Sequence, residues 1–116
     1  MLLVEDDADV GEVLVELLQD ADYQVSWVQN GHEALLHLQR EPLPVAIICD
    51  LQMPLMDGHS LVEQLGRSPR LSAIPVLVVS GSVPSWSAPH VRFLRKPFTN
   101  EQMLEQLSEI TRPPRP

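Results

Sequence analysis

The sequence has one cysteine, one lysine and no long hydrophobic run, and these shortages exclude several kinds of site and segment. With Cys49 alone, the chain can form neither an internal disulfide nor a zinc site built from several cysteines. A lone cysteine also fits a reducing compartment. No apolar run approaches the roughly 18 residues of a membrane span, and the start shows no signal peptide. We therefore expect a cytoplasmic domain without a membrane partner.

Positive charge is scarce as well. The 116 residues carry eight Lys and Arg against sixteen Asp and Glu, a formal net charge of −8. Because nucleic-acid backbones bind surfaces rich in Lys and Arg, we expect no direct nucleic-acid binding. Hydrophobic residues make up 44% of the chain, which is enough for a core at this length. One domain is therefore expected.

Short apolar runs alternate with segments of helical periodicity. The runs that predict strands are "LLVE" (2–5), "YQVSWV" (23–28), "VAIIC" (45–49), "IPVLVV" (74–79) and "HVRFL" (90–94). Helical patterns cover residues 10–21, 34–38 and 103–110, and "MDGHSLVEQLG" (56–66) is a turn followed by a short helix. A capping box of Thr99 and Gln102 precedes the last of them. This alternation predicts an α/β fold, in which helices cover both faces of a parallel sheet.

Polar residues lie at or just after the ends of four of the expected strands. Glu5 and Asp6 follow the first, Asp50 the third, Ser80 the fourth, and the only lysine, Lys96, follows the fifth. The carboxyl ends of parallel strands share one edge of the sheet, so these residues should converge there. Clustered carboxylates repel one another unless a cation lies between them, and an oxygen-only set suits Mg²⁺. A carboxylate in such a site can also form an aspartyl-phosphate, with a lysine and a hydroxyl contacting the phosphoryl oxygens.

Four stretches carry a family resemblance: "LLVEDD", "IICDLQMPLMDG", "VLVVSGS" and "FLRKPF". In this order and near this spacing they resemble the receiver domain of two-component response regulators, in the CheY-like superfamily. The resemblance covers residues 1–111 and implies a flavodoxin-like three-layer sandwich. Its five-stranded parallel sheet would have the order 2-1-3-4-5. Residues 112–116, "RPPRP", would then be a proline-rich tail or the start of a linker.

The resemblance also implies roles for individual residues. Asp50 would be the phosphoacceptor, taking a phosphoryl group from a histidine kinase or a histidine phosphotransfer protein. Asp6 and Asp50 would ligate Mg²⁺, or Mn²⁺, together with the backbone carbonyl of Gln52. Glu5 would act through a metal-bound water.

Further roles concern the end of the fourth strand and the fifth strand. Ser80 and Lys96 would contact phosphoryl oxygens, Ser80 and Phe93 would form the conformational switch, and the Lys96–Pro97 bond would be cis. The domain would be a signalling module rather than an enzyme, although it would catalyse its own phosphorylation and a slow autodephosphorylation.

The chain departs from the family between Ser80 and Lys96. Only fifteen residues separate them, about six fewer than in the family, or roughly 1.7 helical turns. Pro84 and Pro89 also interrupt the segment. We therefore expect the fourth family helix to be shortened or missing, with Trp86 folded over the vacated position rather than exposed. Because this helix helps to form the family's dimer, a monomer is expected without phosphorylation.

Two other functions compete with a phosphoacceptor receiver. The first is an interaction-only receiver, in which the fold persists but phosphorylation is not the signal. The second is a small Mg²⁺-dependent phosphatase with an aspartate nucleophile, because "DADV" at 7–10 matches the D-x-D-x-[TV] pattern of haloacid-dehalogenase-like enzymes. This match is weak, since Asp7 and Asp9 are also ordinary acids for the start of a helix.

Overall fold

Strands and helices alternate along the chain as predicted. The computed structural model describes residues 1–40, 42–52, 56–82 and 84–111. Its strands are β1 (Leu2–Val4), β2 (Ser26–Val28), β3 (Ile47–Asp50), β4 (Val76–Ser80) and β5 (Val91–Arg95). Its helices are α1 (Ala8–Asp20), α2 (Gly31–His37), α3 (Gly58–Gly66) and α4 (Asn100–Thr111). The strands pair in parallel in the order β2-β1-β3-β4-β5, which confirms the predicted topology.

The edge strand β2 is shorter than the sequence indicates. The apolar pattern begins at Tyr23, but the strand begins at Ser26, which pairs with Leu2. In this sheet β2 pairs with β1, which itself begins at Leu2. The start of β2 is therefore set by its pairing with β1, and the apolar residues before Ser26 do not extend the strand.

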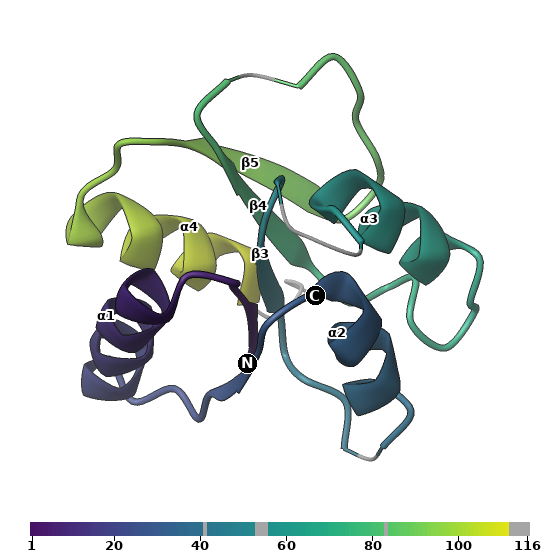
Figure 1. The fold of residues 1–116 in the computed structure, drawn as a ribbon, viewed down its shortest axis with the longest axis horizontal. Coiled ribbons are helices and arrows are strands. Elements are labelled where there is room, and N and C mark those ends of the chain that lie inside the picture. The colour runs from purple at the N-terminus through teal and green to yellow at the C-terminus, as the bar shows by residue number, and fades with distance from the viewer. Residues whose placement is uncertain (41, 53–55, 83, 112–116) are drawn as a thin grey trace, which may run out of the picture.

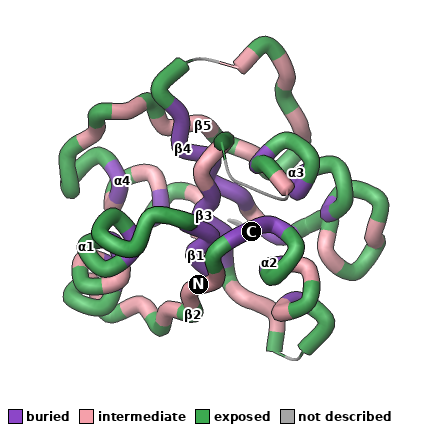
Figure 2. The backbone as a smooth tube through the Cα atoms, viewed as in Figure 1, coloured by how far each residue is buried: buried purple, intermediate pink, exposed green. Residues whose placement is uncertain are grey.

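Side chains alternate across the sheet and bury two separate cores, because successive residues of a strand point to opposite faces. Figure 1 shows α1 and α4 on one side of the sheet and α2 and α3 on the other. Toward α1 and α4 the central strands contribute Leu3, Ile48, Leu77 and Val79. Toward α2 and α3 they contribute Leu2, Val4, Ile47, Cys49, Val76 and Val78. Figure 2 shows the resulting pattern, in which the central strands are buried, the edge strands are partly exposed and the outer helix surfaces are exposed.

Polar side chains fix where the helices begin. The Asp7 carboxylate accepts backbone N–H groups of the first turn of α1, and Asp57 does the same for α3. Asn30 caps α2. Thr99 and Gln102 form the predicted capping box, with N···O distances of 2.8 and 3.0 Å. Asp7 and Asp57 therefore have a structural explanation, because they satisfy N–H groups that a helix start leaves open.

The segment between β4 and β5 carries an aromatic contact in place of a helix. None of its described residues, 81–82 and 84–90, is helical, as the short sequence predicts. The Trp86 ring stacks on His59 of α3, with centroids 4.4 Å apart. It also meets Phe93 of β5 edge-on at 4.9 Å. Trp86 therefore packs against the α2/α3 core, which confirms that it folds back.

The last helix ends at Thr111. The tail predicted at 112–116 lies outside the described residues. Within the described ranges, no helix combines the length and apolar character needed to cross a membrane.

We predict that Cys49 is unreactive in the folded protein. Its side chain is fully buried, and burial together with the charge of Asp50 raises the pKa of its thiol to about 12. Because the thiolate is the reactive form, a disulfide reagent at mildly alkaline pH should label Cys49 only after denaturation. Labelling can be followed by absorbance. Rapid, stoichiometric modification of the native protein would contradict this burial.

We also predict that Trp86 contributes to stability. Trp86→Ala should lower the free energy of unfolding by about 1–3 kcal/mol, because it removes two aromatic contacts and partly buried area. Trp86→Phe should cost less, since a ring remains. Urea unfolding followed by circular dichroism measures both. An unchanged urea midpoint in Trp86→Ala would mean that the Trp86 ring makes no stabilising contact in solution.

Candidate functional site

The carboxylate of Asp50, the last residue of β3, is held at both oxygens. Lys96 Nζ donates to Asp50 Oδ2 at 2.6 Å, and the Gln52 backbone N–H donates to Asp50 Oδ1 at 3.1 Å. The Asp50 side chain is 14% exposed and that of Lys96 40%. The carboxylate is therefore poorly hydrated, and its partner lysine is open to solvent on one side.

Backbone pairing past the strand ends brings these residues together. The Lys96 N–H donates to the Ser80 carbonyl at 2.7 Å, and the Leu51 N–H donates to the Val79 carbonyl at 3.0 Å. Asp50 and Ser80 end β3 and β4, and Lys96 directly follows β5, so the three residues lie at the same edge of the sheet, as expected for parallel strands. The Lys96–Pro97 peptide bond that follows is cis.

A hollow of about 430 Å³ opens beside this pair. It is lined by Asp50, Gln52, Ser80, Gly81, Ser82 and Lys96. Ser80 is buried, and its Oγ accepts the Ser82 backbone N–H at 3.2 Å. This bond uses Ser80 as an acceptor and leaves its hydroxyl proton able to donate. The hollow thus combines a carboxylate, an ammonium group and a hydroxyl.

The acidic loop after β1 lies next to this hollow. Glu5 is only 4% exposed, whereas Asp6 is exposed. Burial raises the pKa of the Glu5 carboxyl, and the neighbouring Asp6 carboxylate, which accepts from protonated Glu5, and the charge of Asp50 raise it further. The backbone N–H of Asp7, 3.2 Å from Glu5 Oε2, acts in the opposite direction. Negative charge therefore accumulates on this side of Asp50.

The residues present suit a hard cation. Among the described residues, no three His, Cys, Asp or Glu side chains are grouped so that they could share a metal ion. Mg²⁺ needs fewer, because it takes one or two carboxylates and keeps several waters. Asp6, Asp50 and the Gln52 carbonyl are an oxygen-only set. The pKa of Glu5 is raised first by burial and then by the neighbouring Asp6 and Asp50, and a cation would offset the negative charge of these neighbours. The donor set therefore fits Mg²⁺.

Phe93 lies apart from the hollow. Its ring packs against Trp86 on the α2/α3 side of the sheet, and it is not among the residues that line the hollow.

Sequence reasoning missed two residues that shape the site. The sequence pattern places Gly58 only in a turn, yet a Cβ there would lie 2.8 Å from the Asp50 carbonyl oxygen. It places Trp27 only in a strand, yet the indole N–H of Trp27 donates to the Glu5 carbonyl at 2.9 Å. The "DG" pair before α3 is a signal for a close approach; nothing in the local sequence indicates the Trp27 bond.

The fold and the site together define a flavodoxin-like signalling domain of the CheY type. The family model described as response regulator receiver domain matches residues 1–108, so the chain belongs to this family. Receiver domains are signalling modules of two-component systems, and they occur in response regulators and in histidine kinases.

Individual relatives agree with this assignment. The probable methanogenesis regulatory protein FilR2 of Methanothrix harundinacea is 30% identical over 95% of this chain and 79% of its own length. The chain spans about half the length of two other curated relatives, 47% of one and 55% of the other. A putative response regulator from Chloroflexus aurantiacus has a TM-score of 0.85 and 30% identity, covering 95% of this chain and 94% of that chain.

A more distant structure shares the fold. The receiver domain of the sensor histidine kinase PA1611 from Pseudomonas aeruginosa has a TM-score of 0.84 at 22% identity, covering 95% of this chain and 94% of its own. That crystal structure holds a magnesium ion coordinated in its active site cleft.

We predict that Gly58 cannot carry a side chain at its present position. Gly58→Ala should lower the free energy of unfolding by about 1–3 kcal/mol, because the new Cβ would meet the backbone of Asp50 and Leu51. Gly66 ends the same helix, and a Cβ added there would have nothing within 4 Å, so Gly66→Ala should be neutral or stabilising by about 0.5–1 kcal/mol. Urea unfolding compares the two, and equal effects would contradict the close approach.

Proposed function

We propose that Asp50 is the phosphoacceptor of this receiver domain and that its phosphorylation requires Mg²⁺. The observation that carries the proposal is the Lys96–Asp50 pair, 2.6 Å apart, at the rim of a hollow that also contains Ser80. A nucleophilic carboxylate beside a positive charge and a hydroxyl donor is the arrangement that phosphoryl transfer requires.

In the proposed reaction an Asp50 carboxylate oxygen attacks the phosphorus of a phosphohistidine. A P–O bond forms as the P–N bond breaks, and the electron pair returns to the imidazole of the donor. Lys96 moves from the Asp50 oxygen to a phosphoryl oxygen, and the Ser80 hydroxyl donates to another. Slow hydrolysis, in which water attacks the same phosphorus, would restore the carboxylate and release inorganic phosphate.

Asp6, Asp50 and the Gln52 carbonyl would hold the metal, and Glu5 would act through a bound water. When bound, Mg²⁺ supplies positive charge that offsets the charge of the phosphoryl oxygens. The magnesium ion in the PA1611 receiver domain shows that a protein of this fold can hold the ion in its cleft.

Phosphorylation would be reported through Ser80 and Phe93. When Ser80 turns toward the phosphoryl group, Phe93 is proposed to move inward on β5. In this chain Phe93 contacts Trp86, and Trp86 contacts His59 of α3. Any movement of Phe93 must therefore change this aromatic contact.

We further propose residues 1–111 as the receiver domain, with 112–116 as a tail or linker. The phosphoryl donor would be a histidine kinase or a histidine phosphotransfer protein in the cytoplasm. Without phosphate the domain would be a monomer, because the described residues 81–82 and 84–90 form no helix that could build the family's usual dimer.

One observation favours a second candidate, the interaction-only receiver. The described part of the β4–β5 segment lacks the helix that normally reports phosphorylation, so the signal could be partner binding alone. The phosphatase alternative is the less favoured reading, because Asp7 has a structural role. The Asp7 carboxylate already accepts the N–H groups of Asp9 and Val10 as the cap of α1.

Intact mass spectrometry tests the proposal. Incubation with Mg²⁺ and either acetyl phosphate or phosphoramidate, which carries a P–N bond, should add one phosphoryl group. Asp50→Ala, or omission of Mg²⁺, should abolish the adduct, whereas Asp57→Ala should keep it because that carboxylate only caps α3. No Asp50-dependent adduct from either donor would contradict the proposal and favour the interaction-only receiver.

A further inference from the structure

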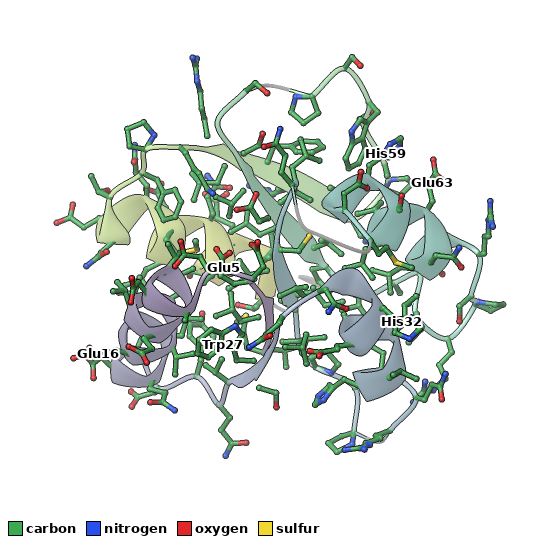
Figure 3. The ribbon with its side chains drawn as sticks, in the orientation of Figure 1. Glu5, Glu16, Trp27, His32, His59 and Glu63 are labelled. Carbon is green, nitrogen blue, oxygen red and sulfur yellow. The ribbon has the colours of Figure 1, made fainter. Side chains whose placement is uncertain are left out.

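The acidic loop that would hold the metal is itself held by the neighbouring strand β2. The Glu5 backbone N–H donates to the Val28 carbonyl at 3.0 Å. On the other side of the same residue, the Trp27 indole N–H donates to the Glu5 carbonyl at 2.9 Å. Figure 3 labels Glu5 and Trp27 on the α1 side of the sheet. Both peptide groups of Glu5 are therefore fixed by β2.

The carbonyl that Trp27 holds is also part of the next residue. A peptide group is planar, so the Glu5 carbonyl and the Asp6 N–H turn together as one rigid unit. Fixing the peptide groups on both sides of Glu5 fixes the direction in which the Glu5 side chain leaves the backbone, and it fixes the positions of the Asp6 N and Cα atoms from which the Asp6 side chain departs. A hydrogen bond to Glu5 thus constrains Asp6, the proposed ligand on this loop.

The indole ring is itself held against α1. A Cβ on Gly11 would lie 2.0 Å from Trp27 Cζ2 and 2.4 Å from Cε2, so the ring occupies the space that any other residue at position 11 would fill. Gly11 is buried in α1, the helix that the same acidic loop enters. Trp27 is therefore fixed between β2 and the first turns of α1, and its N–H has little freedom to leave Glu5.

We propose that Trp27 is a positioning residue for the metal site, acting through the Glu5–Asp6 peptide; the inference rests on the proposed Mg²⁺-dependent function. The ring does not line the phosphoacceptor hollow. Its contribution is to hold Glu5 and Asp6 in place before a cation arrives, so that less ordering is needed on binding. Partners that orient metal ligands in this way typically contribute tenfold or more to metal affinity.

Titration of three proteins with Mg²⁺ alone, by isothermal calorimetry, tests the inference. Trp27→Phe keeps most of the ring but removes the N–H donor, so the dissociation constant should rise about tenfold. Trp86→Phe, at the only other tryptophan, is the matched control and should bind like the wild type. Urea unfolding of both variants is measured in parallel, because a purely structural role would lower stability while leaving the Mg²⁺ affinity of the folded protein unchanged.

A second measurement uses the unmodified protein and holds even if Trp27→Phe folds poorly. The two indole N–H signals are resolved by NMR and assigned with the two Phe variants. The Trp27 signal should shift during the Mg²⁺ titration with the same dissociation constant, and the Trp86 signal should not.

The outcomes separate the two proposals. Equal Mg²⁺ affinity in wild type and Trp27→Phe, or an unmoved Trp27 signal at saturation, would overturn the role of Trp27 and leave the proposed function standing. No Mg²⁺ binding by the wild type would overturn both. Weaker binding in Trp27→Phe alone supports the inference.

Discussion

The site depends on one constraint, which is that a poorly hydrated carboxylate at the end of β3 needs compensating charge. Asp50 ends a buried strand and lies near the raised-pKa carboxyl of Glu5, so its negative charge has little water to stabilise it. The ammonium group of Lys96, just after β5, compensates this charge, and the parallel sheet brings Lys96 and Asp50 together. Because the lysine side chain is long and partly exposed, it can follow a new negative group without leaving the site. The same pair thus stabilises the resting site and, under the proposed function, would also serve an incoming phosphoryl group.

The second feature of the molecule is the way it covers the α3 side of β5. Where the family has a helix, the described residues of this chain place Trp86 between His59 and Phe93. Aromatic contacts of this kind depend strongly on ring geometry, so a small displacement of Phe93 alters them more than it would alter a packed helix face. If Asp50 is phosphorylated as proposed, the surface that changes would be built from α3 and Trp86. A partner that binds this surface would then recognise α3 and Trp86, whereas a partner of other receiver domains would recognise a helix.

The sequence was sufficient for the fold because its signals are local and agree with one another. Alternating apolar runs predicted the strands, and Thr99 with Gln102 marked the last helix at the correct residue. Asp50, Ser80 and Lys96 could be brought together in advance because parallel strands share an edge. Trp27 and Gly58 could not. The role of Trp27 arises from a contact with Glu5, 22 positions away, and depends on the space between β2 and α1. The role of Gly58 arises from how closely α3 approaches the end of β3, which the local sequence does not state. The predicted start of β2 was wrong for a similar reason, because the pairing with β1 sets where β2 begins.

The most direct test of the account is a crystal structure of the protein with Mg²⁺ and beryllofluoride, which imitates a phosphoryl group on a carboxylate. We expect beryllium bonded to an Asp50 oxygen, with Lys96 Nζ and Ser80 Oγ each contacting a fluoride and Mg²⁺ bound by Asp6, Asp50 and the Gln52 carbonyl. Trp86 should have changed its contact with Phe93. A structure in which Lys96 still pairs with an unmodified Asp50, with beryllofluoride absent from the hollow at saturating concentration, would contradict it.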